Sequence, residues 1–210
     1  MAKLSVIYYS ATGHGAAMAR RVADAGEAAG AEVRLRQVAE LAERSAIEAD
    51  PAWLANYEAS VHIPWATGDD IVWADGVIFG TPTRYGSQAW QFRAFIDSLT
   101  PLFMDGKLAD KVYSVFTSGR TQHGGQESTL LNMYVTLMHF GGILVPPGFT
   151  EDLKWTDGNP YGVGHVAGLD NDGAIADATI AALEHLARRV VSVSHRLNTR
   201  LGQPERHGTP

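Results

Sequence analysis

The sequence predicts an α/β fold in which parallel strands form one doubly wound sheet. Two observations indicate this class. Short apolar runs, such as Gly76 to Gly80, alternate along the chain with longer segments in which apolar residues recur at helical spacing. In addition, loops rich in glycine and hydroxyl side chains follow the first, third and fourth of these runs. In sheets of this kind, ligands bind beyond the carboxyl ends of the strands.

The strands are recognised as apolar runs bounded by glycine, proline or polar residues. The third run is almost entirely apolar, which is typical of a strand buried on both faces, whereas the second alternates polar residues with Val33 and Leu35. Pro146 and Pro147 end the fifth run. The five strands are expected at about residues 3–9, 32–37, 76–80, 111–117 and 142–145.

The main helices are recognised by apolar residues that share one face. Phe92, Phe95, Ile96 and Leu99 share such a face, and Gly30 is a typical residue to follow the end of a helix. The helices are expected at about residues 15–29, 87–99, 126–140 and 174–196. Five strands and about five helices fit a three-layer, doubly wound fold of the flavodoxin type with a five-stranded parallel sheet.

Two segments interrupt this alternation, and a third follows it. Residues 39–74 form a long excursion, in which Asp50-Pro51 and Thr67 with Asp70 are typical helix starts. Residues 148–173 are rich in glycine, asparagine and proline and are expected to form an insertion. Residues 1–197 are therefore predicted to form a single domain, and the polar segment 198–210 is predicted to be a disordered tail.

The composition excludes several classes of function. The 210-residue chain has 17 Lys and Arg against 23 Asp and Glu, a net charge of −6, which argues against nucleic acid as a partner. It has no cysteine, which excludes disulfides, thiol nucleophiles and cysteine-ligated metals, so redox chemistry would need a bound cofactor.

Metal binding and membrane association are not expected either. The histidines show no metal-ligand spacing, and Asp170-Asn171-Asp172-Gly173 lacks the glutamate that closes a calcium loop. No signal peptide is recognised, and no apolar run approaches the roughly 18 residues of a membrane span. We therefore expect a cytoplasmic protein without integral membrane association.

The first loop, Ser10-Ala11-Thr12-Gly13-His14-Gly15, predicts a phosphate site without lysine. The free N–H groups of the following helix, the hydroxyls and the close-packed glycines are all suited to phosphate. No Walker A sequence occurs in the chain, which argues against a P-loop. Met18 stands where a dinucleotide-binding fingerprint needs its third glycine or alanine, which argues against a dinucleotide. The terminal phosphate of a mononucleotide is the ligand that remains. An ordinary capped turn is the alternative interpretation.

Two further loops are expected beside the first. The second runs from Gly80 to Gly86, where Tyr85 offers a face for stacking and Arg84 a fixed positive charge, although a plain turn with a surface arginine is the alternative. The third, from Thr117 to Gly125, is long and glycine-rich for a strand-to-helix connection. Three such loops at one end of a sheet favour a ligand site more strongly than any one of them.

His139 lies near the end of the helix expected at 126–140. A cation at a helix C-terminus is the first interpretation of such a histidine, and contact with a substrate or a role in catalysis is the second.

Five motifs together carry a family resemblance. YYSATGHG, FGTPTRYG, SVFTSGRTQHGGQEST, HFGGILVPPGF and GNPYG occur in this order, and their combination is specific although each piece alone is weak. From about residue 3 to residue 197, the chain resembles the WrbA family of flavodoxin-like, FMN-dependent NAD(P)H:quinone oxidoreductases.

The resemblance implies a non-covalently bound FMN, with NADH or NADPH as co-substrate. It assigns the FMN phosphate to the first loop, the isoalloxazine to the second loop and the polar edge of the ring to the third. The cofactor-binding residues implied in this way are Ser10, Ala11, Thr12, Gly13, His14, Gly15, Pro82, Thr83, Arg84, Tyr85, Thr117, Ser118, Gly119, Arg120, Thr121, Gln122, Gly124, Gly125 and His139.

The resemblance also implies how substrates are received. His139 matches a histidine beside the flavin, Phe103 stands where a tryptophan often walls the quinone site, and Arg84 would stabilise the negative charge of the reduced ring. The implied catalytic residues are therefore Arg84, Tyr85, Phe103 and His139. The family forms homotetramers, as dimers of dimers, whose active-site cavities are built from more than one subunit.

The activity implied is two-electron transfer from NAD(P)H to quinones, in two half-reactions at one site, which predicts ping-pong kinetics. A flavodoxin-type one-electron carrier is one alternative, although such carriers are usually shorter and more acidic than this chain. A non-catalytic, flavin-binding regulatory protein is the other, but the sequence contains no recognisable module for binding a macromolecule.

Overall fold

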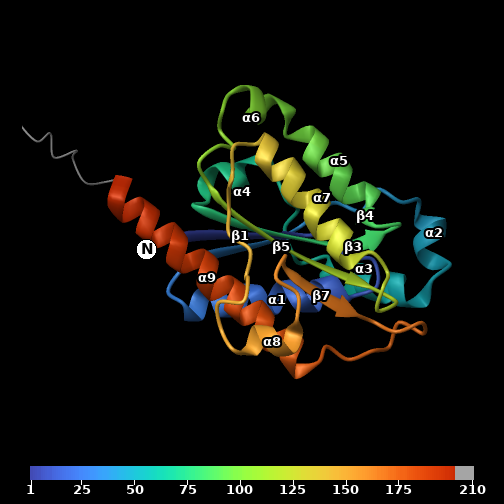
Figure 1. The fold of residues 1–210 in the computed structure, drawn as a ribbon. Coiled ribbons are helices and arrows are strands. Elements are labelled where there is room, and N and C mark those ends of the chain that lie inside the picture. The colour runs from blue at the N-terminus through green and yellow to red at the C-terminus, as the bar shows by residue number, and fades with distance from the viewer. Residues whose placement is uncertain (202–210) are drawn as a thin grey trace, which may run out of the picture.

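One mainly parallel sheet runs through the centre of the molecule and is covered by helices on both faces (Figure 1). The structure is a computed structural model that describes residues 1–201. The sheet has the order β2-β1-β3-β5-β6, so the chain moves in one direction from β1 to β2 and in the other direction from β3 onward. These strands are β1 (Lys3–Tyr8), β2 (Glu32–Gln37), β3 (Gly76–Arg84), β5 (Val112–Gly119) and β6 (Ile143–Leu144). The predicted doubly wound α/β fold is confirmed.

Alternate side chains of the central strands enter two separate cores. Val6 and Tyr8 of β1 pack towards α1 (His14–Ala28) and α9 (Asp177–Leu201). Ile7 and Tyr9 pack on the opposite face, in the core that contains residues of α5 (Trp90–Ser98) and α7 (Gln126–His139). Burial on both faces explains why these strands are almost continuously apolar in sequence.

The long excursion after β2 contains α2 (Arg44–Glu48), α3 (Pro51–Ser60) and α4 (Gly68–Trp73). The Asp50 carboxylate accepts hydrogen bonds from the N–H groups of Ala52 and Trp53, at 3.0 and 3.2 Å, and so caps α3. Asp70 accepts from the Thr67 N–H at 3.0 Å in the capping box of α4. Both predicted helix starts are confirmed.

The expectation of a plain loop at 80–86 is wrong. β3 continues to Arg84, because Thr81 and Pro82 still pair with Thr117 and Ser118 of β5. The chain then turns back into β4 (Ser87–Gln88), so residues expected to begin a helix form the second strand of a hairpin. α5 begins only at Trp90 and is followed by the short α6 (Thr100–Met104).

The insertion at residues 148–173 contains α8 (Leu153–Asp157) and a further strand, β7 (Val163–Val166). β6 pairs with β5 at Val112 and Tyr113, and β7 pairs with it from Phe116 to Gly119. The two short strands therefore share one edge of β5, and the sequence analysis assigned no strand or helix to this insertion. The four residues of β7, Val163-Gly164-His165-Val166, include a glycine and give no recognisable alternation.

The last helix, α9, runs into the segment 198–210 for which the sequence predicts a disordered tail. Residues 202–210 lie outside the described part of the chain. In residues 1–201, no helix has both the length and the apolar character needed to cross a lipid bilayer.

Candidate functional site

The carboxyl ends of β1, β3 and β5 border a cavity of about 470 Å³, at the point where the strand order reverses. This volume lies within the range of about 300–1,000 Å³ that is usual for small-molecule sites. Its walls are formed by Ser10, Ala11, Thr12, His14, Gly15, Asp50, Trp53, Pro82, Thr83, Arg84, Tyr85, Ser118, Gly119, Arg120, Thr121, Gly124, Ala167 and Asn171. The structure therefore brings the three predicted loops together around one space.

The first loop ends in a helix start that has no side-chain cap. Gly13 is the N-cap of α1, with φ +101°, and its N–H donates to Ser10 Oγ at 3.1 Å. A Cβ on Gly15 would lie 3.0 Å from the carbonyl oxygen of Tyr9 and 3.2 Å from the Cβ of Ser10. The glycines therefore allow a tight turn, and the first N–H groups of α1 remain for a ligand at the positive end of the helix.

Side chains from distant segments hold this loop in place. Asn56 of α3 donates from Nδ2 to the carbonyl oxygens of Ser10 and Ala11, at 2.8 and 3.0 Å. On the other side, Thr12 Oγ1 donates to Asn171 Oδ1 at 3.2 Å. The excursion after β2 and the turn after β7 thus both brace the loop.

The second loop is a tight hairpin that carries Tyr85 at its tip. Tyr85 and Gly86 have φ values of +53° and +78°, as a two-residue type I′ turn requires. A positive φ raises the free energy of a tyrosine residue by something of the order of 1 kcal/mol. The side chain of Tyr85 is fully exposed, so packing within the chain does not offset this cost. Arg84 lines the cavity beside it, and its Nη1 donates to the carbonyl oxygen of Thr83 at 3.1 Å.

The third loop packs directly against the second. A Cβ on Gly125 would lie 2.7 Å from the Cα of Gly86, so only glycine allows this close approach. Thr117 is buried and donates to the Thr81 carbonyl oxygen at 2.6 Å, which makes it a link between strands β3 and β5 and not part of the cavity wall.

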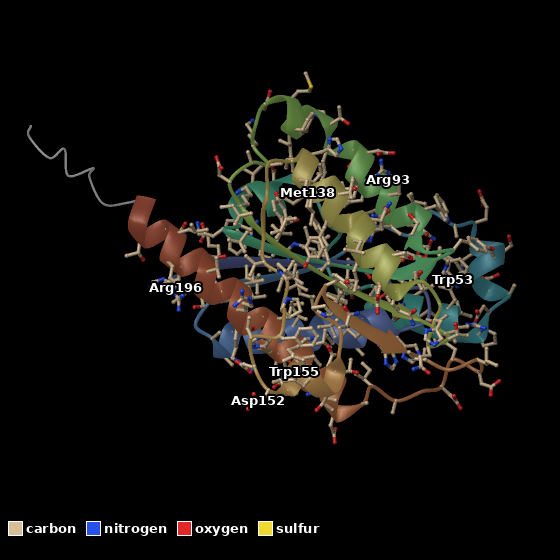
Figure 2. All side chains as sticks on the ribbon, viewed as in Figure 1. Trp53, Arg93, Met138, Asp152, Trp155 and Arg196 are labelled. Carbon is tan, nitrogen blue, oxygen red and sulfur yellow. The ribbon has the colours of Figure 1, made fainter. Side chains whose placement is uncertain are left out.

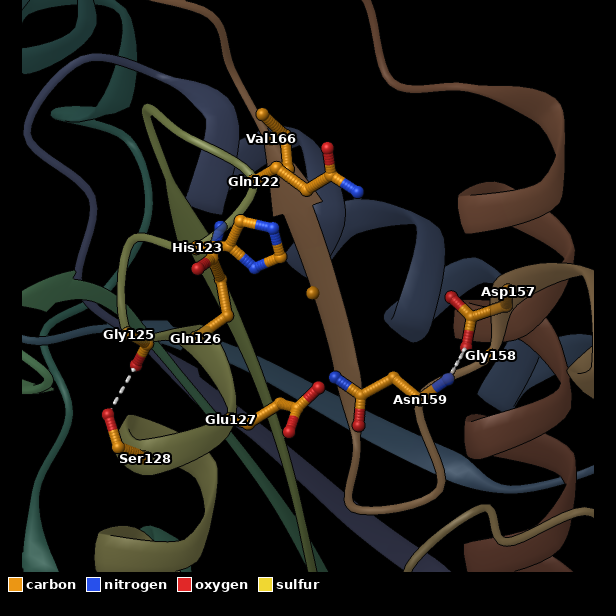
Figure 3. Close-up of a pocket in the computed structure, with 11 residues that line it drawn as sticks. Gln122, His123, Gly125, Gln126, Glu127, Ser128, Asp157, Gly158, Asn159 and Val166 are labelled. Atoms are coloured by element: carbon orange, nitrogen blue, oxygen red, sulfur yellow. Dashed lines mark hydrogen bonds between the residues drawn. The ribbon is translucent and has the colours of Figure 1, made fainter.

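A second cavity, of about 440 Å³, lies on the other side of the third loop (Figure 3). Gln122 and Gly125, two predicted cofactor-binding residues, line this second cavity and not the first. His123, Glu127 and Asn159 complete much of its polar wall.

The structure does not bring His139 and Phe103 to the first cavity of the same chain. α7 begins at Gln126, beside the third loop, and ends at His139. At 1.5 Å per residue, this helix spans about 20 Å, so His139 lies at the other end of the sheet. Phe103 is also there, because its ring centroid lies 6.4 Å from that of Phe140.

Four wall residues, Asp50, Trp53, Ala167 and Asn171, were not among the site residues predicted from the sequence. Asp50 was recognised only as a helix cap. Asn171 lies in the sequence Asp-Asn-Asp-Gly, which is typical of a turn but does not indicate which segment the turn contacts. Trp53 is positioned by Glu40, which accepts from its Nε1 at 2.9 Å. These residues belong to the cavity only through contacts between segments far apart in sequence.

The carboxylate of Glu40 organises a small polar cluster behind the first loop. It accepts from Tyr9 OH and from Gln91 Nε2, both at 2.8 Å, in addition to Trp53. Burial, followed by the hydrogen bond to Glu40, raises the pKa of the Tyr9 phenol above its ordinary value. Tyr9 therefore stays protonated and acts as a donor that anchors the excursion to β1.

The arrangement fits a flavin mononucleotide. The uncapped start of α1 and the hydroxyls of Ser10 and Thr12 suit a phosphate. Tyr85 and Trp53, also on the cavity wall, offer aromatic faces for a planar ring.

Comparison with known proteins agrees with this fit. Residues 3–155 match the family model described as NADPH-dependent FMN reductase. A Deinococcus radiodurans protein named NAD(P)H dehydrogenase (quinone) is 44% identical over 93% of this chain and 96% of its own. A protein of the same name from Geotalea daltonii is 40% identical over 93% of this chain and 98% of its own.

A solved structure shows the same fold. It is described as a flavodoxin, WrbA-like protein from Agrobacterium tumefaciens, and it superposes with a TM-score of 0.66 at 22% identity, over 93% of this chain and 99% of its own. The resemblance found in the sequence is thereby confirmed. The chain belongs to the NADPH-dependent FMN reductase family and, within it, to the group of NAD(P)H dehydrogenases (quinone).

Proposed function

We propose that this protein binds FMN in the cavity beyond β1, β3 and β5, and uses it to transfer two electrons from NAD(P)H to quinones. The observation that carries the proposal is the meeting of three sequence-distant loops around one cavity at the uncapped start of α1. The names of the curated relatives support the same reaction. Because NAD(P)H is an intracellular reductant, we propose the cytoplasm as the place of action.

Each loop has a separate role in this proposal. Bound FMN supplies the redox chemistry, by accepting electrons from nicotinamide and passing them to a quinone. Residues 10–15 would hold its phosphate, and the guanidinium of Arg84, which lines the cavity, would offset negative charge on the reduced ring. Tyr85, exposed at the hairpin tip, is free to cover a flat ligand beside the cavity.

An anaerobic visible spectrum tests the function. Peaks near ~375 and ~450 nm, typical of bound flavin, are expected to bleach on addition of NADH and to return with benzoquinone. Initial rates with both substrates varied are expected to give parallel double-reciprocal lines, because nicotinamide leaves before quinone enters the same site.

The other outcomes are equally informative. A flavin that ignores NADH would favour a one-electron carrier, and intersecting lines with a ternary complex would contradict the ping-pong order. A protein that binds a macromolecule but shows no turnover would favour the regulatory alternative. If no flavin binds even with added FMN, the assignment of residues 10–15 is wrong.

We further propose a homotetramer in which His139 and Phe103 reach the cavity of a neighbouring subunit. Leu131, Val135 and Met138 form an exposed apolar stripe on α7, at i, i+4 and i+7, next to the end that carries His139. Figure 2 labels Met138 on this helix. Exposed apolar patches of this kind favour protein–protein contact. The family resemblance, which implies cavities shared between subunits, gives the tetrameric state.

Replacing Met138 with glutamate is expected to dissociate the assembly, because burying an unpaired carboxylate in an apolar interface is unfavourable. Light scattering would show wild type at four times the chain mass of 22.6 kDa and the variant at a lower mass. Quinone turnover is expected to fall while FMN stays bound. Arg21→Glu, at an exposed position on α1, is the control and should change neither property. A monomeric wild type with full activity would contradict the proposal.

A further inference from the structure

Two histidines meet behind the phosphate loop. His14 opens α1 and lines the cavity, and His165 of β7 is only 3% exposed. His14 Nδ1 and His165 Nε2 are 3.1 Å apart, and the two ring centroids are separated by 4.9 Å. At this distance, one of the two nitrogens must carry a proton and the other must accept it.

The outer ring nitrogen of His14 faces a carbonyl oxygen. His14 Nε2 lies 3.1 Å from the carbonyl oxygen of Asn171, which can only accept, so this nitrogen is the donor. While His14 is neutral, its Nδ1 therefore has no proton, and Nε2 of His165 is the donor between the two rings.

A count of protons shows how this chain of hydrogen bonds can gain a charge. The bond to Asn171 needs one ring proton, and the bond between the rings needs one more. Two neutral imidazoles supply both protons and leave Nδ1 of His165 unprotonated. A third ring proton, on that nitrogen, would give the pair a single positive charge.

The surroundings of the pair oppose that charge until an anion arrives. Burial, then the charge of His14, lowers the pKa of His165, while the nearby backbone of Gly173 acts in the opposite direction. Among the described residues, no other charged group contributes to this shift. The charged side chains on the cavity wall are Asp50, Arg84 and Arg120. Those on the elements around the pair are Arg20, Arg21, Asp24 and Glu27 of α1, Glu127 of α7, Asp170 and Asp172 of the turn after β7, and Asp177, Glu184, Arg188, Arg189 and Arg196 of α9.

We propose that His14 and His165 share one proton, which serves as the counter-charge of the FMN phosphate, with His165 as a positioning residue behind His14. The loop from Ser10 to Gly15 has no lysine or arginine, so this shared proton takes their place. A phosphate at the start of α1 favours the charged pair, and binding of FMN is therefore coupled to uptake of a proton. This inference rests on the proposed binding of FMN.

Isothermal titration calorimetry of the apoprotein at pH 7.5, in two buffers with different ionisation enthalpies, measures the coupling. At this pH the phosphate is already mainly a dianion, because its second pKa is about 6, so its own titration contributes little. FMN is expected to take up a substantial fraction of one proton, whereas riboflavin, which lacks phosphate, is expected to take up none. FMN affinity should then fall as pH rises, by at most about tenfold per pH unit.

Two variants separate this role from a structural one. His165→Asn is expected to lose most of the proton uptake and to flatten the pH profile of FMN affinity. His185→Asn removes another buried histidine, on α9, and should leave both unchanged. If His165→Asn does not fold, ¹⁵N NMR of the histidine rings in wild type gives the same information, since FMN should shift one ring towards imidazolium.

The results separate this inference from the proposed function. Tight FMN binding by wild type without proton uptake, or equal uptake by His165→Asn, would overturn the shared proton but leave the FMN site intact. Unchanged neutral histidine signals on addition of FMN would do the same. Failure of wild type to bind FMN at all would instead overturn the proposed function.

Discussion

Replacing Lys154 with methionine is expected to lower the free energy of unfolding by about 3–5 kcal/mol. Lys154 is completely buried in α8, and its Nζ pairs with Oδ2 of Asp157, whose side chain is only 5% exposed. Removing the ammonium group leaves an ionised carboxylate buried without its counter-charge, which costs far more than an exposed ion pair contributes. Urea unfolding followed by circular dichroism would measure the loss.

A paired substitution distinguishes charge from packing. Lys154→Met combined with Asp157→Leu removes both charges, and much of the lost stability should return, although the contact of Asp157 with the Asn159 N–H is also lost. Lys107→Met is the matched control, because Lys107 pairs with Asp105 at 3.0 Å on the surface and should matter little. Equal losses for the Lys154 and Lys107 variants would contradict this interpretation.

Replacing Gly15 with valine is expected to weaken FMN binding at least about a hundredfold. The new Cβ would press on the Tyr9 carbonyl oxygen and on Ser10, both fixed by the end of β1, so the first turn of α1 must move. Losing two hydrogen bonds to a charged phosphate, at about 1.5–3 kcal/mol each, corresponds to this factor or more. Quenching of FMN fluorescence on titration with apoprotein measures the affinity.

Ala17→Val is the control for this substitution. Ala17 is exposed on the same helix, so its valine tests the cost of a β-branched residue in α1 without touching the loop. Thermal unfolding of both apoproteins shows whether each variant is folded. A folded Gly15→Val protein with wild-type affinity for FMN would show that the phosphate does not lie at the start of α1.

Features set by neighbouring residues could be predicted from the sequence. The caps at Asp50 and Thr67, and the glycine-rich turn before α1, depend on hydrogen bonds within a few residues, and each appears as expected. The apolar face of α5 was equally clear, because Phe92, Phe95 and Ile96 are all buried.

Features set by distant partners could not be predicted. β3 extends through Arg84 because β5 and β4 pair with it, and β7 exists because the edge of β5 is free beyond Tyr113. Neither pairing can be recognised from the residues of the strand alone, because strand formation depends on the neighbouring strands. In the same way, Trp53 and Asn171 reach the cavity through contacts with Glu40 and Thr12, which no local motif signals.

The brace on the phosphate loop also has a consequence for how the protein is made. Thr12 and His14 are held by Asn171, which lies 159 and 157 residues later in the chain. During synthesis, the loop and α1 leave the ribosome long before the turn that fixes them, and such long-range closure is a slow step in folding. A nascent chain that ends before residue 171 has the loop and its contacts with Asn56 but lacks the contacts with Asn171, so the site takes its final form only near the end of translation.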